Sequence, residues 1–398
     1  MTDLSPPAPA RLVTARFGLV VTCGFLYFFA IAMVMPVIPH YVEDELGLGK
    51  IAVGVGVGAF AFGAVILRTY AGRIGDRAGR RILIIAGALI VAFSTVLYGV
   101  VDELWWLVVA RIVSGIGEAA FFVGAATMIT DLAPAERRGE AISYWSISVY
   151  GGITFGPAFG DFVAGDDRYG LTWAVSAAFA LAAGVLALFT RDVPRDPHAQ
   201  PYARLIYRAA LLPGVVLFLG LIALGGYITF LPLYADDELD VNVGLVFLLY
   251  GALILGIRIF GARIPDRLGG RTSATVALAV SAIGVAIIAA IPSVAGLLAG
   301  TIVFAVGMSL MYPALLLLGL SGVPDSERAA AIGTISSFFD LSQGIGPLIC
   351  GVVAASTGDR GAFAAGAVAA LAGLVVLRAS APRPDASPAV LDGVAEAH

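Results

Sequence analysis

The stretch of sequence that decides the fold is RTYAGRIGDRAGRR, residues 68–81, which returns 190 positions later as RIFGARIPDRLGGR, residues 258–271. Both copies begin and end on an arginine, and both contain an Ile-x-Asp-Arg run. Each copy lies between two apolar runs that are long enough to cross a bilayer. Self-similarity at a fixed offset indicates duplication. The chain is therefore predicted to consist of two related halves, each containing a basic turn.

The composition of the chain predicts a membrane protein. Apolar residues make up 59% of the 398 residues and charged residues only 13%, whereas soluble domains are nearer to half apolar and about a quarter charged. A water-soluble fold has too little interior to hide so much apolar surface. In lipid each spanning backbone must satisfy its own hydrogen bonds, which favours helices. We predict an all-α membrane protein.

Apolar runs of about 20 residues, the length that crosses the hydrocarbon core, occur twelve times. They cover residues 16–39, 50–70, 82–101, 104–130, 139–164, 171–190, 208–234, 243–262, 272–291, 294–319, 328–355 and 361–379. We predict a tail at 1–15, a six-helix bundle at 16–190, a proline-containing linker at 191–207, a second six-helix bundle at 208–380 and a disordered tail at 381–398.

The placement of basic residues predicts the orientation. Of the 24 lysines and arginines, only Lys50, Arg168 and Arg360 fall in the predicted outer loops, and Arg111 falls within a span. Because basic residues are enriched in cytoplasmic loops, both termini and the linker are predicted to be cytoplasmic. The excess of arginine over lysine favours a prokaryotic source, and hence a multi-pass protein of the inner (plasma) membrane.

The basic turn carries a resemblance to a known family. Residues 72–81 resemble motif A of the major facilitator superfamily, and the matching positions are Gly72, Asp76, Arg77, Gly79, Arg80 and Arg81. The second half keeps Asp266 and Arg267 but has Pro265 and Gly270 where the first has Gly75 and Arg80, which predicts a weaker copy. The resemblance implies a loop that latches neighbouring helices and governs alternation between two states. The alternative is a turn that is basic only to set topology.

The fourth span contains a charged pair of positions. Arg111 to Glu118 reads RIVSGIGE and resembles motif B of the same family. A charged side chain deep in the bilayer is costly and is usually functional or paired. The resemblance links Arg111 to proton handling, and the depth of Glu118 makes it a second candidate. The alternative is an internal ion pair that holds helices together.

The fifth span contains glycines at a spacing of four residues, together with a proline. Gly152, Gly156, Pro157 and Gly160 resemble motif C, the antiporter signature of the family, except that Asp161 replaces its last glycine. Glycines at this spacing form a smooth helix face that allows close packing. Asp161 is a further candidate for proton or substrate binding. Small-residue packing without an antiport role is the alternative.

The eleventh span contains Asp340, about twelve residues from its inner end and thus ~18 Å deep at the rise of an α-helix. Burial disfavours the charged form of a carboxylate that has no partner, which suits a group that binds and releases a proton. Gln343 accompanies it. The alternative is a structural hydrogen-bonding role. Four aromatic residues are candidates for an amphiphile pocket, namely Tyr27, Phe122, Tyr150 and Tyr227, although each alone is more often a packing residue.

Other chemistries find no support in the sequence. The two cysteines and three histidines have no metal-binding spacing, so no metal site is expected. No nucleotide-binding loop lies between a strand and a helix, and a net charge of −4 disfavours a nucleic-acid partner. We expect no enzyme activity and no cofactor, with the proton gradient as the energy source.

The resemblance implies a secondary transporter with its substrate site between two bundles near the midplane. Our first hypothesis is a proton-coupled antiporter that exports amphipathic drugs or toxic metabolites, with a small amphipathic molecule, protons and the lipid bilayer as partners of a monomeric protein. A symporter or uniporter for a sugar or another nutrient is the first alternative. A non-transporting receptor or scaffold is the second.

Overall fold

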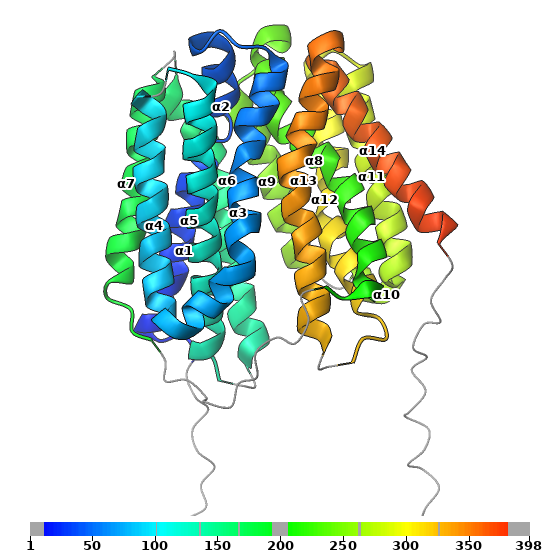
Figure 1. The fold of residues 1–398 in the computed structure, drawn as a ribbon. Helices are drawn as coiled ribbons and strands as arrows, with labels where there is room; N and C mark the ends of the chain where they lie inside the picture. Colours follow the sequence, from blue (N-terminus) through cyan, green and yellow to red (C-terminus); the bar gives the residue numbers. More distant parts are fainter. Residues whose placement is uncertain are drawn as a thin grey trace, which may run out of the picture. The chain divides into compact units, whose positions relative to one another are not determined.

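The computed structural model describes residues 12–100, 102–134, 137–165, 168–192, 206–261, 264–324 and 327–380, apart from a few side chains inside helices. Within these ranges all regular structure is helical, and twelve helices have 18 residues or more (Figure 1). The all-α architecture and the twelve long helices agree with the prediction from sequence. The tails at 1–11 and 381–398 and most of the predicted linker lie outside the described residues.

The helices follow one another in two similar series. The first comprises α1 (Ala15–Met33), α2 (Val37–His40) with a π-helical turn at Tyr41–Glu45, α3 (Lys50–Ala78), α4 (Arg80–Leu97), α5 (Leu104–Leu132), α6 (Arg138–Ala164) and α7 (Tyr169–Ala187). The second comprises α8 (Leu211–Leu239), α9 (Val243–Phe260), α10 (Ile264–Leu268), α11 (Gly270–Ala290), α12 (Val294–Leu320), α13 (Arg328–Thr357) and α14 (Asp359–Ala379).

Eleven of the described helices are long and apolar enough to cross a membrane. The one remaining predicted span is α6, the fifth in chain order. It is long enough at 27 residues but contains more polar side chains than a typical span, among them Ser143, Ser146, Ser148 and Asp161. These side chains lower its hydropathy relative to the other helices. The helix is nevertheless packed along α1, and its buried residues between positions 148 and 160 are Ser148, Gly151, Gly152, Thr154, Gly156, Pro157 and Gly160. Helix α6 is therefore part of the helix bundle, like the other eleven long helices.

The chain divides into two compact units. Unit 1 consists of Met1–Gly47, Ala59–Pro197 and Val243–Gly251, and unit 2 consists of Leu48–Gly58, His198–Asn242 and Ala252–His398. Two helices therefore contribute to both: the first nine residues of α3 count with unit 2, and the first nine residues of α9 count with unit 1.

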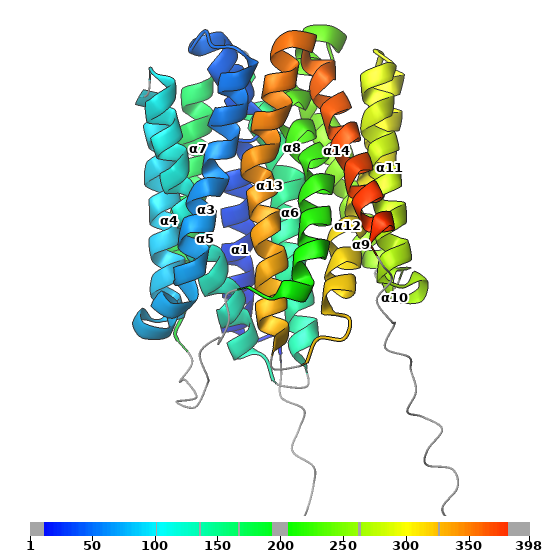
Figure 2. The same ribbon diagram turned by 45° about the vertical axis from the view of Figure 1, so that its right-hand side comes forward.

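The two units repeat the same pattern of helix packing. In unit 1, α1 packs against α6 and α7, while α4 packs against α5 and α7. In unit 2, α8 packs against α13 and α14, while α11 packs against α12 and α14 (Figure 2). Four helices of the second series, α11, α12, α13 and α14, each begin 190 positions after their counterpart. The sequence repeat is therefore a structural repeat.

The basic turn differs between the copies where their sequences differ. In the first copy α3 continues without a break to Ala78. In the second copy α9 ends at Phe260 and a separate helix, α10, begins at Ile264 with Pro265 as its second residue. Proline is accepted in a first helical turn because the amide hydrogen there has no intrahelical acceptor. The substitution of Gly75 by Pro265 thus accompanies a new helix start.

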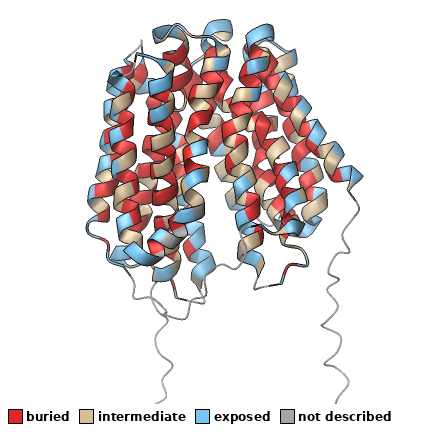
Figure 3. Ribbon diagram, in the orientation of Figure 1, coloured by how far each residue is buried: buried red, intermediate tan, exposed pale blue. Residues whose placement is uncertain are grey.

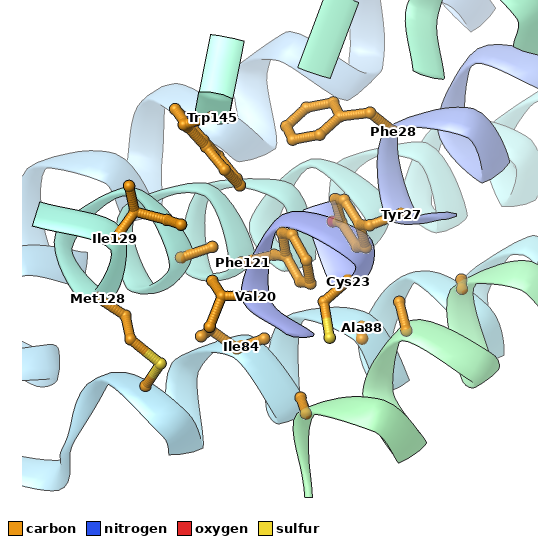
Figure 4. Packing of buried hydrophobic residues seen from close by; sticks show 14 of the residues in the cluster. Val20, Cys23, Tyr27, Phe28, Ile84, Ala88, Phe121, Met128, Ile129 and Trp145 are labelled. Carbon is orange, nitrogen blue, oxygen red and sulfur yellow. The ribbon is translucent and has the colours of Figure 1, made fainter. Parts of the chain in front are cut away.

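Buried and exposed residues alternate along the long helices (Figure 3), and many large apolar side chains are exposed. At the centre of the unit 1 core, the Tyr27 ring stacks on Phe121 with centroids 3.6 Å apart. Phe28 and Trp145 lie edge to face beside them, with centroids 6.0 Å apart (Figure 4). Edge-to-face and stacked aromatic pairs each contribute roughly 0.5–1.5 kcal/mol beyond their buried area. Exposed apolar side chains of this kind are expected on helices that lipid surrounds.

A glycine with positive φ ends the basic turn in both copies. Gly79 has φ 103° and Gly269 has φ 78°, and each immediately precedes the next helix. A Cβ atom at position 79 would also lie 2.4 Å from an oxygen of Asp192. We predict that Gly79→Ala lowers the stability by about 1–3 kcal/mol, the usual cost of this backbone region for other residues.

The measurement is thermal unfolding of the purified protein in detergent. Gly139→Ala is the matched control, because position 139 lies in α6 with nothing within 4 Å of an added Cβ. Equal melting temperatures for the two variants would show that the turn tolerates a side chain.

Candidate functional site

The crossing of α3 and α5 brings two backbones into direct contact. A Cβ atom on Gly63 of α3 would clash with the carbonyl of Ile112 on α5, and a Cβ atom on Gly115 of α5 would clash with the carbonyl of Phe60 on α3. Each helix thus offers a glycine to the other. Such small-residue crossings let helices approach closely in the absence of a hydrophobic driving force. This crossing fixes the rotation and depth of the side chains that follow it.

About one turn beyond this crossing, an ion pair joins the two helices. The Arg68 Nη2 atom lies 2.9 Å from Glu118 Oε2 and 3.2 Å from Oε1. The Arg68 guanidinium carbon also lies 5.0 Å from the centroid of the Phe122 ring. Of the two side chains, Arg68 keeps 24% of its surface exposed and Glu118 keeps 10%. The sequence analysis named Glu118 as a candidate but assigned no role to Arg68. Arg68 could have been found from the sequence, because it is an arginine within an apolar span and recurs as Arg258 in the second half.

Arg111 lies deeper in unit 1 than Arg68. It is 5% exposed, and its guanidinium carbon lies 4.9 Å from the Phe60 ring centroid and 6.0 Å from that of Tyr98. A buried hydroxyl cluster adjoins it: the Ser114 hydroxyl lies 2.7 Å from that of Ser94 and is hydrogen-bonded to the Tyr98 hydroxyl. Contact with aromatic faces favours a buried guanidinium by cation–π attraction. The position of Arg111 between α3 and α4 therefore stabilises the interior of the bundle.

The four aromatic candidates fall into two groups. Tyr27 and Tyr227 are completely buried, the former stacked on Phe121 and the latter with its hydroxyl 3.1 Å from that of Thr301. In this structure neither is reachable from outside its unit. Phe122 and Tyr150 are partly exposed. Phe122 lies beneath Arg68, with its ring centroid 5.0 Å from the guanidinium carbon.

Asp340 lies near the middle of α13 and is 5% exposed. Gln343 follows one turn later on the same helix face, and its side-chain carbonyl oxygen is buried without a hydrogen-bond partner among the described residues. Ser342 instead donates to the carbonyl of Phe339 at 2.6 Å. The helix thus places one carboxyl and one amide together in an apolar interior.

Near this pair, within unit 2, the first turns of α3 lie directly on α13. A Cβ atom on Gly58 would clash with the carbonyl of Gly344, and a Cβ atom on Gly54 would clash with that of Pro347. Gly344 is four residues, or about one turn, beyond Asp340. Lys50, the one lysine of the chain, is the first residue of α3 and forms an ion pair with Asp359 at 3.0 Å. Only 6% of the Asp359 side chain is exposed. The members of this pair are 309 positions apart, and no feature of the sequence predicts their contact.

The motif C residues of α6 lie on two sides of the helix. Gly152, Gly156 and Gly160 all face α1, where added Cβ atoms would clash with backbone atoms from Phe25 to Met33. Asp161 instead accepts a hydrogen bond from the Gly244 backbone N–H at 3.1 Å, at the start of α9. A carboxylate at a helix N-terminus is stabilised by the unpaired N–H groups and the helix dipole. Asp161, the residue that departs from motif C, thus caps the N-terminus of the neighbouring helix α9.

The basic turns cap helices in both copies. Arg81 donates to the Leu188 carbonyl at the end of α7 at 2.6 Å, and its own backbone N–H donates to Asp192 at 2.9 Å. Arg271, its repeat partner, donates to the carbonyls of Leu377 and Ser380 at the end of α14. These last carbonyls have no intrahelical donors, so an arginine satisfies them. One role of the repeated turn is therefore to hold the last helix of each series.

The structure describes fewer contacts for the other residues of the basic turn. Arg80 lies 3.2 Å from Asp131 on α5, which ties the start of α4 to the end of α5. Arg77 and Arg267 are exposed. The surroundings of Gly72 and the side chains of Asp76 and Asp266 lie outside what the structure describes. The predicted latching by these acids therefore stays a prediction.

A duplicated helical membrane protein with charged side chains inside its bundles has the architecture of a membrane transporter. The sequence profile of the Major Facilitator Superfamily matches residues 20–333 of the chain. The chain therefore belongs to the major facilitator superfamily, as its sequence motifs predict. This is a family of transporters and not of enzymes.

Relatives and solved structures agree with this assignment. An uncharacterised MFS-type transporter of Salmonella typhimurium is 31% identical over 367 residues, which cover 89% of this chain and 93% of that protein. A bacterial homologue of the human lysosomal transporter Spinster, crystallised in an inward-facing and unoccupied conformation, has a TM-score of 0.75 at 18% identity and covers 91% of this chain and 94% of its own.

The nucleoside transporter NupG has a TM-score of 0.76 at 13% identity, covering 92% of this chain and 99% of its own. At these identities the two solved structures establish a common fold and carry no information on substrate.

The α3–α5 crossing generates a prediction about stability. Gly115→Val should separate the two helices and lower the stability by about 1–3 kcal/mol, the usual cost of overpacking, because the new side chain would clash with the backbone of Phe60 and Ala64. The melting temperature in detergent measures this loss. Gly256→Val on α9 is the control, since nothing lies within 4 Å of an added Cβ there. A melting temperature equal to that of the control would contradict the crossing.

Proposed function

We propose that this protein is a proton-coupled antiporter that exports an amphipathic drug or toxic metabolite by alternating access. It works as a monomer in the inner membrane of a prokaryote, with both termini in the cytoplasm. The proton gradient drives it without a cofactor. The membership in a transporter family supports the general activity, and the observation that carries the proton coupling is the buried carboxyl of Asp340.

Asp340 has the properties of a proton-binding group. A charged carboxylate is expensive in an apolar interior, and binding a proton removes that charge. Asp340 is 5% exposed, so its carboxyl is removed from bulk water in the present state. When α13 becomes accessible to water, the same carboxylate can ionise at little cost. Protonation is thereby coupled to the state of the protein.

The neighbourhood of Asp340 supports a link between its charge and a conformational change. The Gly344 carbonyl, one turn further along α13, is the atom on which Gly58 of α3 rests. A contact between two backbones without intervening side chains can be opened without loss of a large apolar surface. A proton on Asp340 would favour the dry, closed contact, whereas the ionised form would favour its hydration. A ligand or proton shifts a conformational equilibrium only by such a difference in affinity.

Glu118 and Asp161 are the other two acids considered for proton binding. The charge of Glu118 is already compensated by Arg68 at 2.9 Å. Asp161, the third candidate, accepts a hydrogen bond from the α9 N-terminus. We assign proton binding to Asp340, with Gln343 as its polar neighbour, and keep Glu118 as the second candidate.

Transport in inverted membrane vesicles tests the proposal. With a pH gradient imposed, amphipathic dyes of either charge should accumulate in the wild type in proportion to the gradient. Asp340→Asn should reduce gradient-driven accumulation by at least about tenfold, because an amide cannot release a proton. Downhill exchange of the dye should persist in this variant.

Asp237→Asn, an exposed acid at the end of α8, is the matched control and should transport like the wild type. Full gradient dependence in Asp340→Asn would remove Asp340 from the mechanism. Dye movement that ignores the gradient in the wild type would contradict antiport and favour a uniporter.

A further inference from the structure

We propose that the ion pair between Lys50 and Asp359 is a lock that holds the first turns of α3 against α13, and that α3 leaves α13 when the pair separates. The two residues are the first residues of α3 and α14, at the outer ends of these helices in the proposed orientation. The inference rests on the proposed function only in that the protein works by alternating access, and it needs no coupling to protons. It gives the pair a role in the choice between two states of the transporter.

The contact that the pair locks is built from glycines. Within unit 2, Cβ atoms added to Gly54 and Gly58 of α3 would clash with carbonyls of α13, and one added to Gly351 of α13 would lie 2.6 Å from the Lys50 carbonyl oxygen. From Lys50 to Gly58 this contact extends for about 12 Å at the rise of an α-helix. The two backbones meet directly at these points. The glycines provide close packing but no attraction between charges.

The ion pair adds that attraction at one end of the contact. Lys50 Nζ lies 3.0 Å from Asp359 Oδ1 and 3.1 Å from Oδ2. Only 17% of the lysine side chain and 6% of the aspartate side chain are exposed. Charges removed from water attract each other more strongly than charges at a surface. Removal of one member leaves the other poorly hydrated, so a state that returns the remaining charge to water becomes more populated.

The aspartate end of the lock is held in place by its own surroundings in unit 2. Asp359 begins α14, where the helix dipole favours a carboxylate. Arg360, the next residue, donates to the Ala289 carbonyl near the end of α11, through Nε at 2.9 Å and Nη2 at 2.6 Å. Helix α14 also packs against α8 and α13. The movement that separates the pair is therefore a movement of Lys50 together with the start of α3.

Helix α3 is built to move as one body. It runs without a break from Lys50 to Ala78. Further along it is fixed to α5 by the crossing of Gly63 and Gly115. A straight helix that is held at this crossing carries its first turns with it. The glycine contacts with α13 therefore open together when the ion pair no longer holds the end of the helix.

Opening of this contact changes the surroundings of Asp340. Gly58 rests on Gly344, which lies one turn beyond Asp340 on the same face of α13. Lys50 lies at the other end of the contact. Separation of the pair thus allows water to reach the helix face that carries the proposed proton-binding group.

The internal repeat shows that this type of contact forms without an ion pair. The positions 190 residues from Lys50 and Asp359 are occupied by Asp240 and Tyr169, which carry no opposite charges. The equivalent contact of α9 with α6 has the Asp161 hydrogen bond to a helix N-terminus instead. Close packing of the helices therefore does not require the lysine and the aspartate. The pair makes one of two equivalent contacts depend on charge.

Thiol labelling of the protein in nanodiscs tests the lock without any gradient. The reporter is Val57→Cys, because Val57 is partly buried and lies three residues after Gly54, on about the same side of α3. The native Cys23 and Cys350 are fully buried and give a low background. The reagent is the uncharged N-ethylmaleimide, and the readout is the labelling rate by mass spectrometry.

In this background, Lys50→Gln and Asp359→Asn should each raise the labelling rate at least about fivefold, because each removes the attraction that holds α3. The two substitutions change the local charge in opposite directions, so a rise in both reports opening. The charge-reversed double variant, Lys50→Asp with Asp359→Lys, should return the rate at least halfway to that of the reporter alone. Asp237→Asn, an exposed acid at the end of α8, is the matched control and should leave the rate unchanged.

Unchanged rates in the two single variants would overturn the lock, as would a double variant that labels as fast as they do. If one single variant does not fold, the other decides. A confirmed lock in a protein whose vesicle transport ignores the pH gradient would stand while the antiport proposal falls. Gradient-dependent transport with unchanged labelling would remove the lock alone.

Discussion

The contact between the backbones of α3 and α5 is the constraint on which the interior of unit 1 depends. Two helices that touch through Gly63 and Gly115 have little freedom to rotate or slide. In water, burial of apolar surface would hold them, but lipid is as apolar as the side chains it replaces. Close backbone packing and polar contacts must therefore supply the attraction. The crossing provides the first, and the Arg68–Glu118 pair, one turn away, provides the second.

The same principle recurs wherever a helix joins another at close range. Gly54 and Gly58 bring the start of α3 onto α13 within unit 2, and Gly244 and Gly251 bring the start of α9 onto α6 within unit 1. These two contacts are repeat equivalents, since Gly54 and Gly244 are 190 positions apart. The polar interactions that accompany these two contacts differ. The first is completed by the Lys50–Asp359 ion pair, and the second by a carboxylate at a helix N-terminus.

Duplication explains both the likeness and the difference. The shared part is the packing pattern and the glycine and arginine positions of the basic turn, which any bundle of this design requires. Several polar side chains inside the bundles are not shared. Arg111 and Glu118 occur in one series and are replaced by Thr301 and Met308 in the other, while Asp340 occupies the position equivalent to Tyr150. The two units therefore share a packing scaffold but carry different charged side chains inside it.

The sequence by itself determined the helices, their number and the duplication, because hydropathy and internal similarity are local properties of the chain. It also determined the family, through motifs that lie in contiguous segments. It identified Glu118, Asp161 and Asp340 as unusual, since a charged residue in an apolar run is visible without a structure.

What only the tertiary structure decided is the partner of each charge. Arg68 and Glu118 are 50 positions apart, and Lys50 and Asp359 are 309 positions apart. Their pairing depends on the rotation and depth of separate helices, which are set by backbone contacts at glycines. A hydropathy pattern carries no information on those contacts. For the same reason the sequence grouped Glu118 with Asp340, whereas the structure shows that an arginine compensates the first and that the second lies buried beside a backbone contact.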